Sequence, residues 1–453
     1  MRIRPIVEQP RSAGTFARDN SNAAARALVH RLFSGVGTGL AVELGDGTRL
    51  FDSGAPIKAT IVVRNAGTLR LLIAGPNAQA VASAVVRGDI GVTGDIEWAI
   101  ACVEQLAGLR KPADWFAILL LSLRLPVTRR AASASASRLP FHARGRKHSR
   151  RRDRAAIEYH YDVSNEFFAL WLDRELTYSC AYFRGDAGSL DAAQVAKLDH
   201  ICKKLRLRAG ERLLDIGCGW GSLVRYAARE YGARVTGITL SARQAEYARA
   251  RIAREGLDGT CAVELRDYRD VAPLGRFDKI ASVGMVEHVG SERLGEYFAS
   301  AYAALEPGGL FLNHGIASQR KRPAGLRRLV GALAPPRSEF IERYVFPDGN
   351  LPRLEEIVAR AEASGFEVRD VENLREHYVR TLRQWVQRLE AHEHAARSIV
   401  GDETYNVWRF YMAGSAHGFA AGRMGIDQVL LAKPLPGGRA LLPPTRDDIY
   451  QTR

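Results

Sequence analysis

The stretch LLDIGCGWGSL, residues 213–223, decides the fold of the larger part of this chain. The run LLDI predicts a buried strand, and Gly217, Gly219 and Gly221 predict a tight turn into a helix. A strand, a glycine-rich turn and a helix together suggest a site for a nucleotide-like cofactor. Similar turns occur in α/β proteins that bind nothing, so the glycines alone leave that alternative open.

Outward from this stretch, apolar strand-like runs alternate with amphipathic helical stretches. The expected strands are 212–216, 234–239, 261–266, 277–283 and 309–316, with late runs at 366–374 and 426–433. Such alternation is typical of an α/β fold with a doubly wound, mainly parallel sheet. The sequence therefore predicts a Rossmann-like domain from about residue 156.

The spacing of the glycines separates the cofactor classes. A dinucleotide site needs G-x-G-x-x-G and an acidic residue about 20 positions on, whereas this chain has G-x-G-x-G and Thr239 at the end of the second strand. A phosphate-binding P-loop is excluded because no Lys-Ser or Lys-Thr pair follows the glycines. S-adenosylmethionine fits better, because it carries no phosphate and needs only close backbone approach and neutral hydrogen bonds.

Length and composition set further bounds. The chain has 453 residues, 46% hydrophobic and 25% charged, which predicts two or three globular domains. Its five cysteines form no C-x-x-C pair and no zinc spacing, so neither a disulfide framework nor a metal site is indicated and a cytoplasmic location is expected. The most apolar run, WFAILLLSL at 115–123, is too short to span a bilayer.

The net charge of +15 is concentrated in one segment. Residues 138–154 hold eight Lys or Arg and one Asp, so they carry seven of the fifteen charges. Such a cluster can bind an anionic membrane surface or nucleic acid, or can be a solvated linker. Few aromatic residues lie among these charges, which disfavours a stacking platform for single-stranded nucleic acid.

The chain divides into four expected parts. Residues 1–125 predict a small α+β domain, in which TIVVRN and LRLLIAG are the expected strands. Residues 126–155 predict a basic, flexible linker of Ser, Ala, Arg and Pro. Residues 156–433 form the expected catalytic domain, and 434–453 a C-terminal tail.

A series of motifs from residue 156 to 433 closely resembles the cyclopropane-fatty-acyl-phospholipid synthases. In order they are YHYDVSNEFFALWLDRELTYSCAYF, LLDIGCGWG, VTGITLSARQ, RDYRD, SVGMVEHVG, FIERYVFPDGNLP and HYVRTLRQW. The resemblance implies a class I methyltransferase domain that binds S-adenosylmethionine and acts on the cis double bond of an unsaturated phospholipid acyl chain. The N-terminal part is more distantly similar to the lipid-binding domain of bacterial members.

The resemblance also implies the site residues. The implied cofactor residues are Tyr178, Ser179, Gly217, Gly219, Thr239, Gln244 and Tyr268. The family uses a bound bicarbonate ion as base, and the matching catalytic positions are Cys180, Glu287, His314, Ile316 and Tyr378. No metal is implied.

Each catalytic candidate also has a structural interpretation that the sequence leaves open. Cys180 could be a small core residue, and His314 an interior histidine with its hydrogen bonds satisfied. Glu287 could cap the helix expected at 291–305, and Tyr378 could only pack.

Two departures from the family pattern stand out. Ser164 replaces a common glycine in HYDVSN, and LNHGIAS replaces the more usual LHTIG. The second change lies beside the implied bicarbonate, where it can alter the fate of the carbocation. Relatives of the family give methyl-branched or methylene products instead of rings.

We therefore expect a transferase that makes cyclopropane fatty acids, associated peripherally with the inner face of the membrane and without nucleic acid. A homodimer is one option for its assembly. A non-catalytic lipid-binding protein and a nucleic-acid methyltransferase are the alternatives from other classes.

Overall fold

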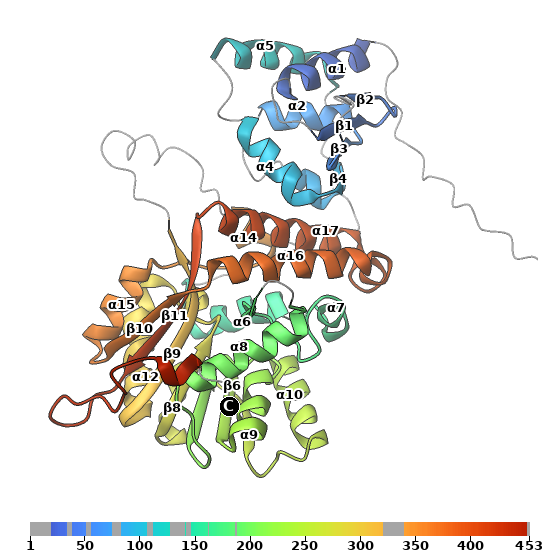
Figure 1. Ribbon diagram of the computed structural model, residues 1–453. Coiled ribbons are helices and arrows are strands. Elements are labelled where there is room, and N and C mark those ends of the chain that lie inside the picture. The colour runs from blue at the N-terminus through green and yellow to red at the C-terminus, as the bar shows by residue number, and fades with distance from the viewer. Residues whose placement is uncertain are drawn as a thin grey trace, which may run out of the picture. The chain divides into compact units, whose positions relative to one another are not determined.

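The computed structural model describes ten stretches of the chain, shown as coloured ribbon in Figure 1. They are residues 20–33, 39–50, 56–74, 83–106, 112–126, 141, 146–161, 163–185, 188–319 and 339–450. These residues form two compact units. Unit 1 contains the described residues up to 126 with 339–340 and 401–414, and unit 2 contains the rest.

Unit 2 is built on a seven-stranded sheet in the order β10-β11-β9-β8-β5-β6-β7. Its strands are β5 (Arg212–Ile216), β6 (Arg234–Thr239), β7 (Cys261–Leu265), β8 (Phe277–Val283), β9 (Leu305–Ser318), β10 (Glu367–Asn373) and β11 (Met424–Ala432). The pairs from β7 through β9 are parallel, and β11 is antiparallel to both of its neighbours. The predicted α/β fold with a mainly parallel sheet is confirmed.

Helices cover both faces of this sheet (Figure 1). The larger ones are α6 (Arg150–Tyr161), α8 (Leu190–Lys204), α9 (Ser222–Tyr231), α10 (Ala242–Arg254), α12 (Leu294–Ala304), α15 (Leu354–Ala363) and α16 (Arg375–Ala391). Residues of α8, α9 and α10 form one apolar core with the sheet, and residues of α12 and α15 form a second core on its other face. The sheet is therefore buried on both sides, as parallel sheets are.

Short elements complete unit 2. They are α7 (Asn165–Ala169), η1 (Tyr268–Asp270), η2 (Ala272–Leu274), α11 (Val286–Val289), η3 (Ser291–Arg293), α18 (Asp447–Tyr450) and α14 (Glu339–Tyr344), whose first two residues belong to unit 1. Ser164 caps α7, because its hydroxyl accepts a hydrogen bond from Phe167 N at 3.0 Å. This contact gives Ser164 a structural role at the start of α7.

Unit 1 has a four-stranded mixed sheet in the order β2-β1-β3-β4. Its elements are α1 (Asn20–Phe33), β1 (Leu40–Leu44), β2 (Arg49–Leu50), β3 (Ala59–Val63), α2 (Ala66–Ala74), β4 (Ile90–Gly94), α4 (Ile96–Leu106) and α5 (Pro112–Leu123). The expected strand LRLLIAG is wrong, since most of it lies in α2. Asn65 begins that helix by accepting a hydrogen bond from Gly67 N at 2.9 Å.

The structure also changes two expected domain limits. Helix α6 begins at Arg150, inside the segment expected as a linker, and Arg152 in its first turn pairs with Asp348 through Nη2 and Oδ1 at 2.8 Å. Residues 127–140 and 142–145 of that segment lie outside the described residues.

The expected catalytic domain is interrupted at α17 (Glu393–Ala420). Gly401 has a φ of 77° inside this helix, and residues 401–414 belong to unit 1. There Arg409 Nη1 donates to Val92 O at 2.9 Å. This hydrogen bond joins residues 401–414, which come late in the sequence, to strand β4 of the unit 1 sheet.

The expected C-terminal tail is partly ordered in the structure. Its short helix α18 packs against α8, with Ile449 buried and Arg206 paired with Asp448 at 2.8 Å. No helix among the described residues is long and apolar enough to cross a bilayer.

Candidate functional site

The glycine turn after β5 adopts a conformation that requires glycine. Gly217, Gly219 and Gly221 have φ angles of 81°, 54° and 80°, in the left-handed region that other residues rarely adopt. The amides of Gly217 and Cys218 both donate to Ile238 O, at 2.9 and 3.0 Å. The turn is thus fixed against β6, and its backbone borders a pocket at the carboxyl ends of the strands.

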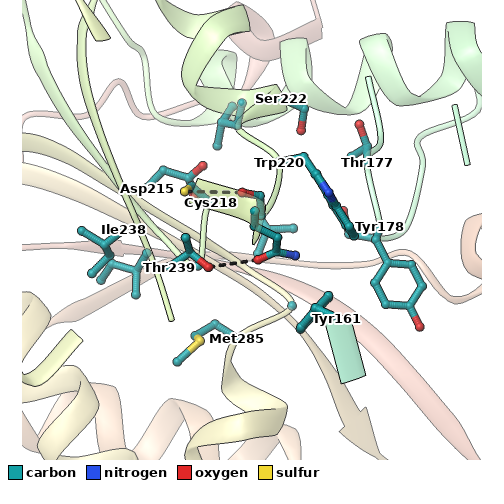
Figure 2. A pocket seen from close by; sticks show the side chains of 18 of the residues that line it. Tyr161, Thr177, Tyr178, Asp215, Cys218, Trp220, Ser222, Ile238, Thr239 and Met285 are labelled. Atoms are coloured by element: carbon teal, nitrogen blue, oxygen red, sulfur yellow. Dashed lines mark hydrogen bonds between the residues drawn. The ribbon is translucent and has the colours of Figure 1, made fainter. Parts of the chain in front are cut away.

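All seven residues implied for the cofactor line this pocket: Tyr178, Ser179, Gly217, Gly219, Thr239, Gln244 and Tyr268. In Figure 2, Asp215, Cys218 and Thr239 lie on one side of it and Tyr178 and Trp220 on the other. Thr239 Oγ1 donates to Gln244 Oε1 at 2.9 Å, drawn as a dashed line in Figure 2. The neutral pair occupies the place where a dinucleotide site has an acid.

The pocket contains charged residues that the sequence analysis did not single out. Asp215 is buried, which raises the pKa of its carboxyl to about 7. Lys197 comes from α8 and is also buried, and His288 lines the same pocket. Asp215 was visible in the motif LLDIG, but nothing in the sequence around Lys197 marks it.

Aromatic rings form a continuous wall beside the pocket. The Tyr178 ring lies 5.2 Å from that of Trp385, which lies 6.0 Å from the Tyr378 ring. The ring of Phe168 lies 5.0 Å from that of Trp220, measured between centroids, and Trp220 Nε1 donates to Asn165 Oδ1 at 2.8 Å. Such a wall excludes water and offers π faces to a cation.

Glu287 does not cap the helix that follows it. Its Oε1 accepts a hydrogen bond from the backbone amide of Ile316 at 2.7 Å. Its Oε2 is buried and has no hydrogen-bond partner in the described part of the chain. Burial raises the pKa of Glu287 to about 7, against an ordinary value of 4.5.

His314 lies on β9 in the sheet, two residues before Ile316. Its Nδ1 lies 3.2 Å from Gln428 Nε2, and in the neutral tautomer that accepts this amide proton the ring proton is on Nε2. Nε2 is buried without a partner among the described residues. Burial lowers the pKa of His314 well below its ordinary value, which keeps the ring neutral.

Cys180 and Tyr378 are linked through the start of α16. Cys180 Sγ lies 3.8 Å from Leu374 O, and Tyr378 N donates to the same carbonyl at 3.1 Å. Leu374 N in turn donates to Ile426 O at 2.7 Å, and Ile426 is the β11 partner of Ile316. The structure therefore brings all five implied catalytic positions into one connected region.

The chemistry of this region differs from nucleophilic catalysis by the thiol. Cys180 is fully buried, and burial raises the pKa of its thiol far above the ordinary value. Among the described residues, no group of three or more His, Cys, Asp or Glu side chains could hold a metal ion. The site instead offers a polar pair, Glu287 and His314, in an apolar aromatic setting.

Comparisons with known proteins agree with this geometry. Residues 148–429 match the family model described as mycolic acid cyclopropane synthetase. The chain is 42% identical over 414 residues, 91% of this chain and 96% of the relative, to a "Probable fatty acid methyltransferase" of Pseudomonas putida. It is 38% identical over 279 residues, 62% of this chain and 68% of the relative, to the cyclopropane-fatty-acyl-phospholipid synthase of Escherichia coli K12.

A solved structure extends the likeness to a cofactor complex. Mycolic acid cyclopropane synthase CmaA1 complexed with SAH and CTAB is 34% identical, with a TM-score of 0.57, over 62% of this chain and 98% of that one. The residues 148–429 that match the family model contain the pocket and the buried residues Glu287 and His314. The chain thus belongs to the S-adenosylmethionine-dependent family of cyclopropane-fatty-acyl-phospholipid and mycolic acid cyclopropane synthases.

Proposed function

We propose that this methyltransferase adds the methyl carbon of S-adenosylmethionine to the cis double bond of an unsaturated phospholipid acyl chain and closes a cyclopropane ring. The observation that carries the proposal is that Glu287 Oε2 and His314 Nε2 are buried without a hydrogen-bond partner among the described residues, and that Glu287 lies between Met285 and His288 of the pocket lining. An alkene is a weak nucleophile, and its methylation leaves a carbocation that water would quench. A dry site that still holds polar groups suits this reaction.

The donor and acceptor set also fits a bicarbonate ion. His314 Nε2 offers a proton, and Glu287 Oε2 can accept one from the hydroxyl of the ion. Bound bicarbonate would supply the base that removes a proton from the methylated chain. Glu287 and His314 then hold and orient the base, and Tyr378 and Trp385 contribute aromatic faces that stabilise positive charge.

A methyl-branched or methylene product is the second candidate. It is favoured by the relative that matches 91% of this chain, which bears the name fatty acid methyltransferase. The sequence LNHGIAS at the end of β9 supports it too, because Gly315 replaces a side chain next to His314 and Ile316. A Cβ at Gly315 would lie 2.2 Å from Val286 Cγ1, so the Val286 side chain of α11 occupies the space that a side chain at position 315 would need.

The product assay decides between the two candidates. Purified protein is incubated with methyl-labelled S-adenosylmethionine and vesicles of monounsaturated phospholipid, and the fatty acids are separated and identified by mass spectrometry. A labelled cyclopropane supports the first proposal, and a labelled branched or methylene chain supports the second. Label in neither contradicts both.

We propose further that the protein docks on anionic membrane. Arg151 and Arg154 of α6 are exposed, and neither has an ion-pair partner among the described residues. In unit 1, α5 exposes Leu119, Leu120 and Leu123, at 43%, 49% and 56% of their surface. A basic helix and an apolar helix face suit the headgroup layer of a membrane.

Vesicle sedimentation tests the docking. Replacing Arg151 and Arg154 by Glu should weaken binding to anionic vesicles, and raising the salt concentration should weaken binding of the wild type. Arg254→Glu is the matched control, since Arg254 is exposed on α10 of the same unit. Equal binding by the double variant, or binding by the wild type that ignores salt, contradicts the electrostatic part.

A further inference from the structure

Lys197 is a buried cation in the cofactor pocket that the mechanism above does not use. It lies on α8, is 1% exposed, and lines the pocket together with Ser179 and Asp215. An isolated buried charge is costly unless it is paired. An anionic partner is therefore expected for the buried ammonium group of Lys197.

The described residues do not supply that partner in direct contact. Within the part of the chain that the structure describes, the ammonium group of Lys197 has one hydrogen-bond acceptor, Ser179 Oγ at 2.8 Å, and no carboxylate within ion-pair distance. The carboxylate of Asp173 interacts with Lys197 only through its charge, from beyond ion-pair distance, and it already accepts other hydrogen bonds. Its oxygens accept from the amides of Thr177 and Glu175, at 2.7 and 3.0 Å.

The hydrogen bond from Lys197 also fixes the direction of the Ser179 hydroxyl. An ammonium group only donates, so Ser179 Oγ accepts from it and must point its own proton elsewhere. Among the described residues this hydroxyl has no other partner. The proton is thus available to an acceptor in the pocket, and the adjacent cation strengthens it as a donor.

The segment that carries Ser179 is held rigidly by the same helix. Gln194 lies one turn before Lys197, and its Nε2 donates to the carbonyls of Thr177 and Ser179 at 3.1 and 2.9 Å. The side chains of Gln194 and Lys197, both on α8, thus form hydrogen bonds with residues 177–179. A donor placed by fixed backbone contacts is preorganised for a ligand.

We propose that Lys197 is a positioning residue that, through Ser179, binds the α-carboxylate of the methionine part of S-adenosylmethionine. Asp215 lines the same pocket, and its carboxylate is opposite in charge to the ammonium group of a ligand that carries both a carboxylate and an ammonium group. Desolvation lowers the pKa of Lys197 to about 8, and a bound carboxylate would restore the favourable environment of the cation. The inference rests on cofactor binding and not on which lipid product is formed.

Calorimetric titration with two ligands tests it without any lipid. The ligands are S-adenosylhomocysteine and its decarboxylated form, which lacks only the carboxylate. Lys197→Met should weaken binding of S-adenosylhomocysteine by about ten-fold or more, since the ammonium group that orients the Ser179 hydroxyl and strengthens it as a donor is lost, and should leave the decarboxylated ligand within about two-fold. Equal losses for both ligands, or no loss for either, overturn the proposal.

Three further variants separate positioning from a general structural role. Lys204→Met is the matched control, because Lys204 is also fully buried on α8 but pairs with Glu372 at 2.6 Å. It should show no selective loss of S-adenosylhomocysteine. In a Ser179→Ala background, Lys197→Met should change the affinity for S-adenosylhomocysteine by less than about two-fold if Lys197 acts through Ser179.

Lys197→Gln guards against a variant that does not fold. Its amide can donate to Ser179 without a charge, so its affinity for S-adenosylhomocysteine should fall between those of wild type and Lys197→Met. A selective loss that Lys204→Met reproduces, or that persists undiminished in the Ser179→Ala background, overturns the assignment. A wild type that binds neither ligand instead contradicts the cofactor site itself.

Discussion

Glu287→Gln should stabilise unit 2 at alkaline pH while removing activity. The buried carboxyl of Glu287 has its pKa raised from 4.5 to about 7, so the folded state holds its proton more tightly than the unfolded state does. Between these two values the folded protein binds more protons, and the free energy of unfolding falls as the pH rises. Above pH 7 the ionised carboxylate stays buried at a cost.

The magnitude follows from the size of the shift. Each unit of pKa difference is worth about 1.4 kcal/mol, so ionised Glu287 lowers the free energy of unfolding by about 3 kcal/mol above pH 7. A neutral glutamine avoids this cost, and its amide oxygen can still accept from Ile316 N. The stability of the variant relative to wild type should therefore rise by about 3 kcal/mol between pH 4.5 and pH 8.

Urea unfolding of both proteins at several pH values measures this difference, and the product assay measures activity on the same samples. Asp427→Asn is a useful control, since Asp427 is a buried carboxyl on β11 that pairs with Asn373 at 2.7 Å. The Asp427→Asn variant should keep the pH dependence of the free energy of unfolding that Glu287 causes. A constant stability difference between Glu287→Gln and wild type across this pH range would refute the electrostatic reasoning, and full activity would refute the catalytic assignment.

Three other predictions follow from packing and burial. Gly237→Ala should destabilise unit 2 by about 1–3 kcal/mol and weaken cofactor binding, because its Cβ would lie 2.8 Å from Cys218 Sγ in the glycine turn. Urea unfolding measures the loss of stability. Gly259→Ala is the control, since no atom lies within 4 Å of the Cβ it would add. Arg225→Met should cost about 1–3 kcal/mol, since it removes the buried partner of Glu175 and Glu255 while Arg251 still pairs with both, and an unchanged unfolding midpoint would count against this. All five cysteines are buried, so native protein should react with less than one equivalent of a thiol reagent at pH 8, whereas denatured protein should react with five.

The sequence by itself determined the fold of unit 2 and the identity of its cofactor pocket. Periodicity located the strands of the sheet, in several cases to the residue, because each is a short apolar run bounded by turns. The glycine spacing and the absence of an acid at Thr239 selected the class of cofactor. These signals are local, since they depend on neighbours a few positions apart in the chain.

The N-terminal region shows where local signals fail. The run LRLLIAG is apolar and short, so periodicity does not distinguish a strand from a buried helix turn. Asn65 and the packing of Leu69 in the core of unit 1 decide for a helix. The interruption of α17 at Gly401 likewise depends on contacts with residues more than 300 positions away.

Only the tertiary structure decided what the polar residues of the site do. Glu287 contacts Ile316, and His314 contacts Gln428, through pairs separated by 29 and 114 positions. Lys197 carried no signal in the sequence, yet it is buried beside Ser179 and is the one lysine among the described residues that line the cofactor pocket. A residue type gives the chemistry that a side chain can perform, but its protonation and its partners depend on burial and on neighbours that folding brings together.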